Sequence, residues 1–157
     1  MSIEKVRAFF EPLGIAERIQ EFTVSSATVE LAAAALGCEG KRIAKTISLY
    51  KDEGAVLIVA AGDAKIDNHK FKSVFGFKPR MLCFDDVEPR IGHAVGGVCP
   101  FAVNQGVEVY LDTSLQRFST VFPACGSSNS AIELTLPELE SYSQSKGWVD
   151  VCRLPQE

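Results

Sequence analysis

Apolar residues along the chain recur with two periods, one of three to four positions and one of two, which are typical of helices and strands respectively. The helical period is clearest at Ile3, Val6, Phe10 and Leu13, and Gly14 follows as a stop signal. Helices are expected at residues 3–13, 29–36 and 67–74, from about 86 to 91, and from 137 to about 146. Strands are expected at residues 18–24, 43–50, 55–61 and 80–84, and near 107–111, 119–124 and 131–136. The pattern predicts an α/β or α+β fold with about seven strands, many of them paired as hairpins.

Capping and turn residues support these boundaries. The stretch Ser25-Ser26-Ala27-Thr28 offers N-caps for the second helix, and Gly37 closes it. Asp85-Asp86 is expected to cap the helix that reaches Ile91, and Lys51-Asp52-Glu53-Gly54 joins two strands as a hairpin. No repeat, low-complexity segment or linker interrupts the 157 residues, so we expect a single domain over residues 1–157.

Composition restricts the class of protein. Hydrophobic residues make up 46% of the chain and charged residues 23%, and no apolar stretch approaches the ~20 residues of a membrane helix. The N-terminus has no signal-peptide character, so we expect a cytoplasmic protein without a membrane partner. The five cysteines are odd in number and show no C-x-x-C spacing, which argues against a disulfide framework and a structural zinc site. We expect no metal and no other cofactor.

Charge is unevenly distributed along the chain. The net charge is −4, which argues against a protein that binds nucleic acid by broad coating of phosphates. Residues 41–80 nevertheless hold nine basic side chains against four acidic ones, so this segment is +5 and the remainder is −9. Two interpretations stay open: a set of solvated faces, or a local docking surface for the end of a polyanion.

The segment from Gly92 to Pro100 has the most unusual composition in the chain: Gly-His-Ala-Val-Gly-Gly-Val-Cys-Pro. Gly96 and Gly97 allow a positive φ and a close approach of a ligand to the main chain, and Pro100 restricts the far end. A loop of this kind is typical of a ligand cradle, in which the N–H groups of Gly96, Gly97 and Val98 are donors. A plain tight connection is the alternative.

Lys45 is the second candidate for chemistry. It lies in a predicted strand whose alternate residues Ile43, Ile47 and Leu49 are apolar, so its side chain shares their face. Burying an unpaired ammonium is costly. The lysine therefore either snorkels to solvent at the start of the strand or projects into a pocket as a cation for an anionic or carbonyl-bearing ligand.

Four motifs in order resemble those of the YbaK/prolyl-tRNA-synthetase-associated family, which includes free-standing aminoacyl-tRNA editing proteins. They lie between about residues 20 and 145. In order, the motifs are Thr28-Val29-Glu30-Leu31-Ala32-Ala33, Ile43-Ala44-Lys45-Thr46, Gly96-Gly97-Val98-Cys99-Pro100-Phe101, and Ala124-Cys125-Gly126-Ser127-Ser128-Asn129-Ser130-Ala131-Ile132-Glu133-Leu134 with Leu136-Pro137-Glu138-Leu139. The resemblance implies a mixed, mostly antiparallel sheet curled towards a barrel and flanked by helices.

The resemblance also implies an activity: hydrolysis of the ester that joins a wrong amino acid, such as Cys, Ala, Ser or Thr, to the tRNA 3′ end. Lys45 would be the central catalytic residue, and the loop from Gly96 to Pro100 would frame the aminoacyl pocket. The implied substrate-binding residues are Thr28, Thr46, His93, Gly96, Gly97, Val98, Cys99, Pro100, Gly126, Ser127 and Asn129. This chain departs from the family pattern at Cys99, where serine is frequent, and at His93, where an aromatic is frequent, and these differences bear on selectivity. A synthetase partner and the oligomeric state are left open.

Several alternatives remain at this point. Cys99 is a possible nucleophile with His93 as its base. Ser127 and Asn129 either bind substrate or close a turn. The other cysteines, Cys38, Cys83, Cys125 and Cys152, are expected to be packing residues, and His69 a surface residue. The alternative function is a non-catalytic module that binds an aminoacyl end or a protein partner.

Overall fold

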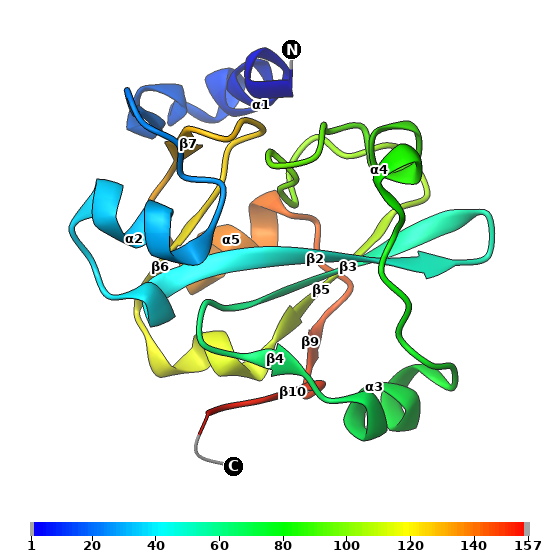
Figure 1. Ribbon diagram of the computed structural model, residues 1–157. Coiled ribbons are helices and arrows are strands. Elements are labelled where there is room, and N and C mark those ends of the chain that lie inside the picture. Colours follow the sequence, from blue (N-terminus) through cyan, green and yellow to red (C-terminus); the bar gives the residue numbers. More distant parts are fainter. Residues whose placement is uncertain (1, 156–157) are drawn as a thin grey trace.

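A six-stranded mixed sheet lies at the centre of the molecule, with the strand order β8-β6-β2-β3-β5-β9 (Figure 1). The computed structural model describes residues 2–155 of the chain. The strands of this sheet are β2 (Ile43–Lys51), β3 (Gly54–Ala61), β5 (Glu108–Asp112), β6 (Thr120–Pro123), β8 (Leu134–Thr135) and β9 (Trp148–Val149). Two short pairs are separate from it: β1 (Gln20–Glu21) with β7 (Ser130–Ala131), and β4 (Lys65–Ile66) with β10 (Cys152–Arg153).

The expected mixed sheet is confirmed, although three of the five strand pairs in its described part are parallel. Within the described residues, the β2–β3, β6–β8, β1–β7 and β4–β10 pairs are antiparallel, whereas β2–β6, β3–β5 and β5–β9 are parallel. The predicted hairpin is also present, and its register pairs Lys45 with Ala60 and Ile47 with Ile58. Every residue of β3 from Ala55 to Ala61 is buried, which explains its continuous apolar run, because both faces of this central strand are covered.

Within residues 2–155, five helices surround the sheet: α1 (Ser2–Phe10), α2 (Val29–Leu36), α3 (Asn68–Phe75), α4 (Phe84–Ile91) and α5 (Leu136–Tyr142). Short 3-10 turns lie at Glu11–Leu13, Ala16–Arg18, Gly40–Arg42 and Thr113–Arg117. The predicted cap of α2 is confirmed, since the Thr28 hydroxyl accepts a hydrogen bond from the Leu31 N–H and Gly37 ends the helix in the left-handed region. In the main core α1 contributes Phe10, whose ring meets that of Phe101 edge-on at 4.9 Å.

Some expected elements differ from the structure. The strand expected at 18–24 is reduced to β1, and the one expected at 131–136 is interrupted between β7 and β8. The last helix ends at Tyr142 rather than near residue 146. The strands β4, β9 and β10 are too short, at two residues each, to produce a detectable period.

The segment around residues 80–86 also departs from expectation. In place of a strand at 80–84 there is a single antiparallel bridge between Leu49 and Met81, and Phe84 already belongs to α4. The N-cap residue of α4 is Cys83, while Asp85 and Asp86 lie within the first turn. There the two carboxylates interact favourably with the helix dipole instead of capping it.

None of the helices among residues 2–155 has both the length and the apolar character needed to cross a membrane.

Candidate active site

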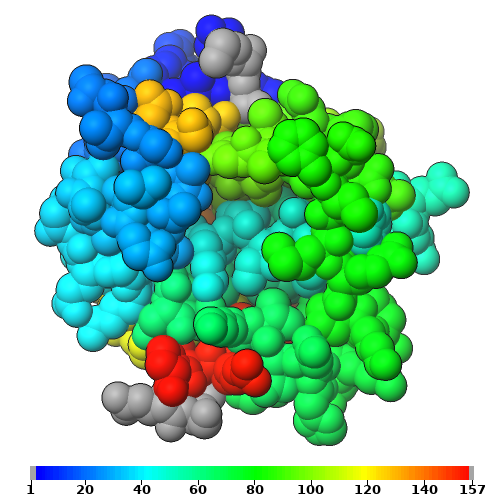
Figure 2. Space-filling view, in the orientation of Figure 1, coloured from blue at the N-terminus to red at the C-terminus, as the bar shows by residue number. Residues whose placement is uncertain are grey.

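The main cavity of the described structure opens along one edge of β2. This strand pairs with β6 only at Ile43 and Ala44, and its outer edge next meets another segment at the bridge from Leu49 to Met81. The gap between these two contacts holds a cavity of about 480 Å³. Figure 2 shows the hollow between the α2 region in blue, the α4 region in green and a floor of β2 in cyan. A volume of this size suits a ligand larger than a single small amino acid.

The walls of the cavity come from five separate parts of the chain. They are the start of α2 with the residues before it, the strand β2, the segment that leads into α4, the glycine loop, and the β6–β7 region. The lining residues include Ser26, Thr28, Val29, Lys45, Thr46, Ile47, Ser48, Met81, Phe84, Val87, Val95, Gly96, Val98, Phe122 and Ser130. Lys45 is the one charged side chain among the described residues that line this space.

Lys45 is half-buried on the floor of the cavity. Its ammonium donates hydrogen bonds to the carbonyl oxygens of Ala64 and Gly62, the latter at 3.4 Å. Neutral carbonyls satisfy the donors but do not cancel the charge. Burial therefore lowers the pKa of Lys45, because it disfavours the charged form. A cation held in this way is available to an anionic ligand or to a developing oxyanion.

Gly62 allows the turn that holds Lys45 to form. A Cβ at this position would lie 2.0 Å from the Gly40 carbonyl oxygen and 2.8 Å from Cγ1 of Val29. Only glycine lets the turn after β3 approach the 3-10 turn at Gly40–Arg42 and the first residue of α2 this closely. Gly62, whose carbonyl accepts one of the hydrogen bonds from Lys45, is thus packed directly against one wall of the cavity.

The glycine loop meets the same cavity. Gly96, with φ +89°, and Val98 line the space, so the structure brings the loop and Lys45 to one site. Gly97 is different: it is buried, and its N–H donates to the Ala94 carbonyl at 3.0 Å. The expectation that the Gly97 N–H is a free donor is therefore wrong, because the loop uses it to close its own turn.

Gly97 is required for packing instead. A Cβ on this residue would meet the Gly126 carbonyl oxygen at 2.7 Å and Cα of Ser127 at 2.9 Å. Both are backbone atoms, so no side chain could move aside. The two glycine-containing motifs of the sequence thus lie against each other, and Gly126 is buried in their contact.

His93 and Cys99 lie behind the loop and do not line the cavity. His93 Nε2 is 2.6 Å from the Phe101 carbonyl oxygen, which makes this nitrogen the protonated one, and it is 3.5 Å from Cys99 Sγ. The His93 Nδ1 atom is buried without a hydrogen-bond partner among the described residues. Pro100 is also buried.

Burial controls the ionisation of both His93 and Cys99. It lowers the pKa of His93 and raises the pKa of the Cys99 thiol to about 12. A buried, protonated thiol beside a neutral imidazole is a poor nucleophile. This geometry favours the interpretation of His93 and Cys99 as packing residues that support the loop.

Ser127 and Asn129 close a turn and hold the segment before α2. The Asn129 side chain donates to the Phe22 carbonyl at 2.9 Å, and the Ser127 hydroxyl bonds Asn129 Oδ1 at 2.9 Å. The Asn129 carbonyl accepts from the Phe22 N–H at 2.7 Å. Neither residue lines the cavity, so of the two open interpretations the structure favours turn closure. Through these bonds they position the wall formed by Ser26 and Thr28.

The apolar wall on the side of α4 was not among the features predicted from the sequence. Phe84 and Val87 line the cavity, and Ile91 on the same helix is buried in the core. Their spacing of three and four positions is a helical signal. It was obscured because residues 80–84 also fit a strand. Cys83, expected to pack, is exposed, whereas His69 is exposed as predicted.

Part of the basic segment is neutralised by local ion pairs. Lys51 bonds Glu108 at 2.5 Å, Lys70 lies 3.3 Å from Asp150, and Lys41 lies 3.3 Å from Glu39. Arg42 is also paired, at 3.1 Å from Glu133. A docking surface for a polyanion, formed by the basic side chains of residues 41–80 outside these ion pairs, stays a prediction.

The comparisons with known proteins define the class to which this site belongs. Residues 23–142 match the model of the aminoacyl-tRNA editing domain, and the chain is a member of that family. The matched range contains Lys45, the glycine loop and the Gly126 turn, and the mixed, curled sheet is the fold of the family's solved neighbours.

Particular relatives cover nearly the whole chain. The uncharacterized protein YwhH of Bacillus subtilis (strain 168) is 55% identical over 155 residues, which is 98% of each chain. A crystal structure of a candidate trans-editing enzyme for prolyl tRNA synthetase is 27% identical with a TM-score of 0.86, and the match covers 97% of each chain. The hypothetical protein APE2540 is 26% identical with a TM-score of 0.83, over 95% of this chain and 99% of that one.

Proposed function

We propose that this protein is a trans-editing deacylase, which hydrolyses the ester bond between a small amino acid and the 3′ end of a mischarged tRNA. The main observation behind the proposal is that the cavity contains a single cationic side chain among its described lining residues. Lys45 is its sole charged lining residue among those described, and the glycine loop lies across the same space. Membership of the editing-domain family supports the choice of an aminoacyl ester as the substrate.

The cavity suits a mechanism based on positioning. No carboxylate or imidazole belongs to the described lining residues, so neither of these common general bases is available there. An aminoacyl ester is already activated, and hydrolysis needs a water molecule held against the carbonyl carbon. The water oxygen forms the new C–O bond, the bond to the ribose oxygen breaks, and that oxygen receives the proton that water loses. A ribose hydroxyl of the substrate, or its thiol when the amino acid is cysteine, assists this proton transfer.

In this mechanism Lys45 stabilises the charge that develops on the ester. Its ammonium is held on the floor of the cavity by the carbonyls of Gly62 and Ala64, so it is oriented before the substrate arrives. The N–H groups of Gly96 and Val98 are proposed as further donors, and Thr46 and Thr28 as polar contacts to the substrate. Cysteine, alanine, serine and threonine are the candidate amino acids.

The experiment that tests the proposal compares two lysines. Wild-type protein, Lys45→Ala and Lys146→Ala are incubated with a panel of tRNAs mischarged with these four amino acids, and the released amino acid is measured. Lys146 is exposed and lies outside both the basic segment 41–80 and the cavity lining, so Lys146→Ala is the matched control. Lys45→Ala should lower deacylation of the preferred substrate by ~10²-fold or more, with an unchanged melting temperature.

Two outcomes would contradict the proposal. Full turnover by Lys45→Ala would remove the assigned role of this residue. A wild-type protein that binds the mischarged tRNAs without releasing any amino acid would favour the alternative, a non-catalytic binding module.

A further inference from the structure

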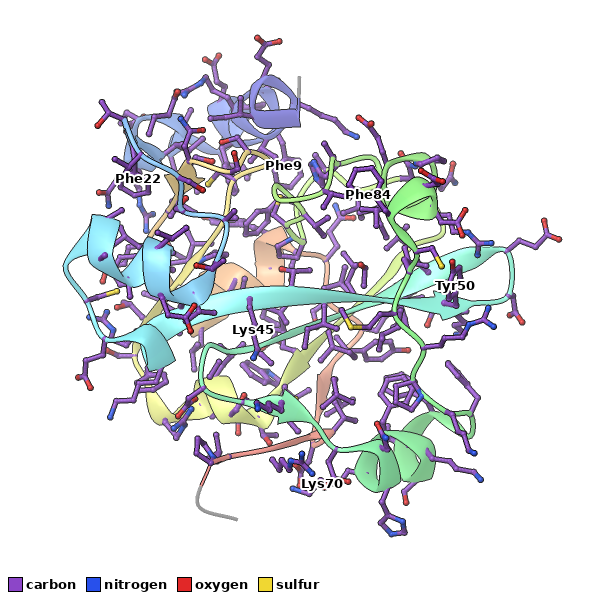
Figure 3. All side chains as sticks on the ribbon, in the orientation of Figure 1. Phe9, Phe22, Lys45, Tyr50, Lys70 and Phe84 are labelled. Atoms are coloured by element: carbon purple, nitrogen blue, oxygen red, sulfur yellow. The ribbon has the colours of Figure 1, made fainter. Side chains whose placement is uncertain are left out.

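An exposed apolar rim on the α4 side of the cavity has no part in the mechanism above. Three of the lining residues expose large apolar side chains to solvent: Phe84 is 75% exposed, Met81 66% and Val95 48%. Single exposed apolar residues are common, but three that line the same cavity mark a candidate binding surface. Figure 3 shows Phe84 at the start of α4, with Lys45 below it in the view on β2.

The backbone beneath the Phe84 ring is firmly anchored. The Tyr50 N–H donates to the Arg80 carbonyl at 2.9 Å, and the Leu82 N–H donates to the Ser48 carbonyl at 3.1 Å. The Tyr50 hydroxyl accepts from the Cys83 N–H at 3.0 Å and itself donates to Asp86. The segment that leads into α4 is thus tied to the end of β2.

The Tyr50 ring also lies against two cationic side chains, which further restrain the segment that leads into α4. The guanidinium carbons of Arg80 and Arg90 lie 4.4 and 4.9 Å from the centre of its ring. Phe84, by contrast, has no ring contact with another described aromatic side chain. A rigid backbone that presents an uncovered aromatic face is the arrangement of a preorganised stacking platform.

We propose that Phe84 stacks against the terminal adenine of the tRNA acceptor end. This inference rests on the proposed function, because an aminoacyl group in the cavity brings with it the ribose and the base to which it is attached. With the ester near Lys45, the base has to leave through the mouth, where Phe84, Met81 and Val95 are exposed. The cavity volume of about 480 Å³ also exceeds what a small amino acid needs, as expected of a site that holds part of a nucleoside.

The test compares wild-type protein and Phe84→Ala on two substrates, in the manner of a double-mutant cycle. The substrates are mischarged tRNAs that carry the amino acid preferred by the wild type and differ only in the terminal nucleotide, which is either adenosine or an abasic ribose. Wild-type protein should lose about 5- to 150-fold in kcat/KM on the abasic substrate, the range expected when one stacked base is removed. On the normal substrate, kcat/KM of Phe84→Ala should be lower than that of the wild type by the same factor. On the abasic substrate, the variant and the wild type should have equal kcat/KM.

Further variants separate stacking from general apolar contact. Phe84→Trp keeps an aromatic face and should retain wild-type kcat/KM, whereas Phe84→Leu keeps apolar bulk only and should behave like Phe84→Ala. Val74→Ala, at a 50% exposed apolar residue of α3 outside the cavity, is the matched control and should leave kcat/KM unchanged. Because Phe84 is so exposed, all its variants should keep the wild-type melting temperature.

The results that would overturn the inference are distinct from those that would overturn the deacylase itself. Equal wild-type turnover of both substrates, or full activity of Phe84→Leu, would refute base stacking, and the latter result would show that the rim needs apolar bulk but no aromatic face. A wild type that hydrolyses neither substrate would refute the proposed function instead.

Discussion

Replacement of Gly97 by alanine probes the contact between the two glycine motifs most directly. The added methyl carbon would lie 2.7 Å from the Gly126 carbonyl oxygen, whereas ordinary contacts of a Cβ begin at 3.4 Å. The loop and the Gly126 turn must therefore separate by about 0.7 Å, the difference between these two distances. Since the obstructing atoms belong to the backbone, the strain is shared between two loops. Overpacking of this kind costs ~1–3 kcal/mol of unfolding free energy.

The consequence for activity follows from where the loop lies. Gly96 and Val98 flank the substituted residue and line the cavity, so a displacement of this size moves proposed donors relative to the ester. Misplacement by ~1 Å can reduce a rate by 10²-fold. We expect Gly97→Ala to lower the melting temperature by about 2–10 °C and kcat/KM on the preferred mischarged tRNA by at least ~10-fold.

Gly54→Ala provides the matched control. Gly54, like Gly97, does not have a positive φ, and a methyl group added to it would have its nearest neighbouring atom 3.8 Å away. Thermal unfolding and deacylation are measured for wild type and both variants. If Gly97→Ala had the stability and turnover of the wild type, the loop and the turn could not be in tight contact. The proposed coupling of this contact to the cavity would then be refuted.

Two further predictions concern ionisation. The hydrogen bonds that Arg18 donates to the Glu138 carboxylate lower the pKa of Glu138 to about 2. Because the pKa in the unfolded chain is about 4.3, this stabilisation is complete above that pH and is lost as the pH falls towards 2. Glu138→Gln should therefore lower the free energy of unfolding by about 1 kcal/mol at pH 7, a value that allows for the partial exposure of both side chains. Near pH 2.5 the substitution should have almost no effect. An equal loss at both pH values, measured by urea unfolding, would contradict the assignment. Cys99→Ser should keep kcat/KM within about threefold of wild type, because the buried thiol stays protonated; a loss of ~10³-fold without unfolding would restore the nucleophile hypothesis.

Local signals in the sequence were sufficient for the elements that depend on neighbouring residues. Thr28 and Gly37 delimit α2 through a side-chain cap and a left-handed glycine, and the turn at Asp52-Glu53 joins β2 to β3. Lys45 could be identified as a pocket residue because an apolar strand face makes an inward lysine conspicuous. These inferences need only the period of the strand and the rules of capping.

Long-range contacts explain what could not be predicted. The burial of the Gly97 N–H depends on the packing of this residue against Gly126. No pattern in the neighbouring sequence predicts that contact. Long-range contacts also determine the segment before α4. It forms hydrogen bonds with Ser48 and Tyr50 of β2 through a single bridge, and it does not form a strand. The apolar wall of Phe84 and Val87 was missed for this reason.

The open stretch of β2 has a consequence for how this fold can acquire new selectivity. The floor belongs to a strand whose inner edge is paired along eight positions with β3, so the backbone ladder that carries Lys45 is separate from the wall on the side of α4. Residues such as Phe84 and Val87 belong to that helix and line the same cavity. Substitutions there can enlarge or reduce the chamber while the lysine stays in register, which lets one scaffold be retuned for side chains of different size.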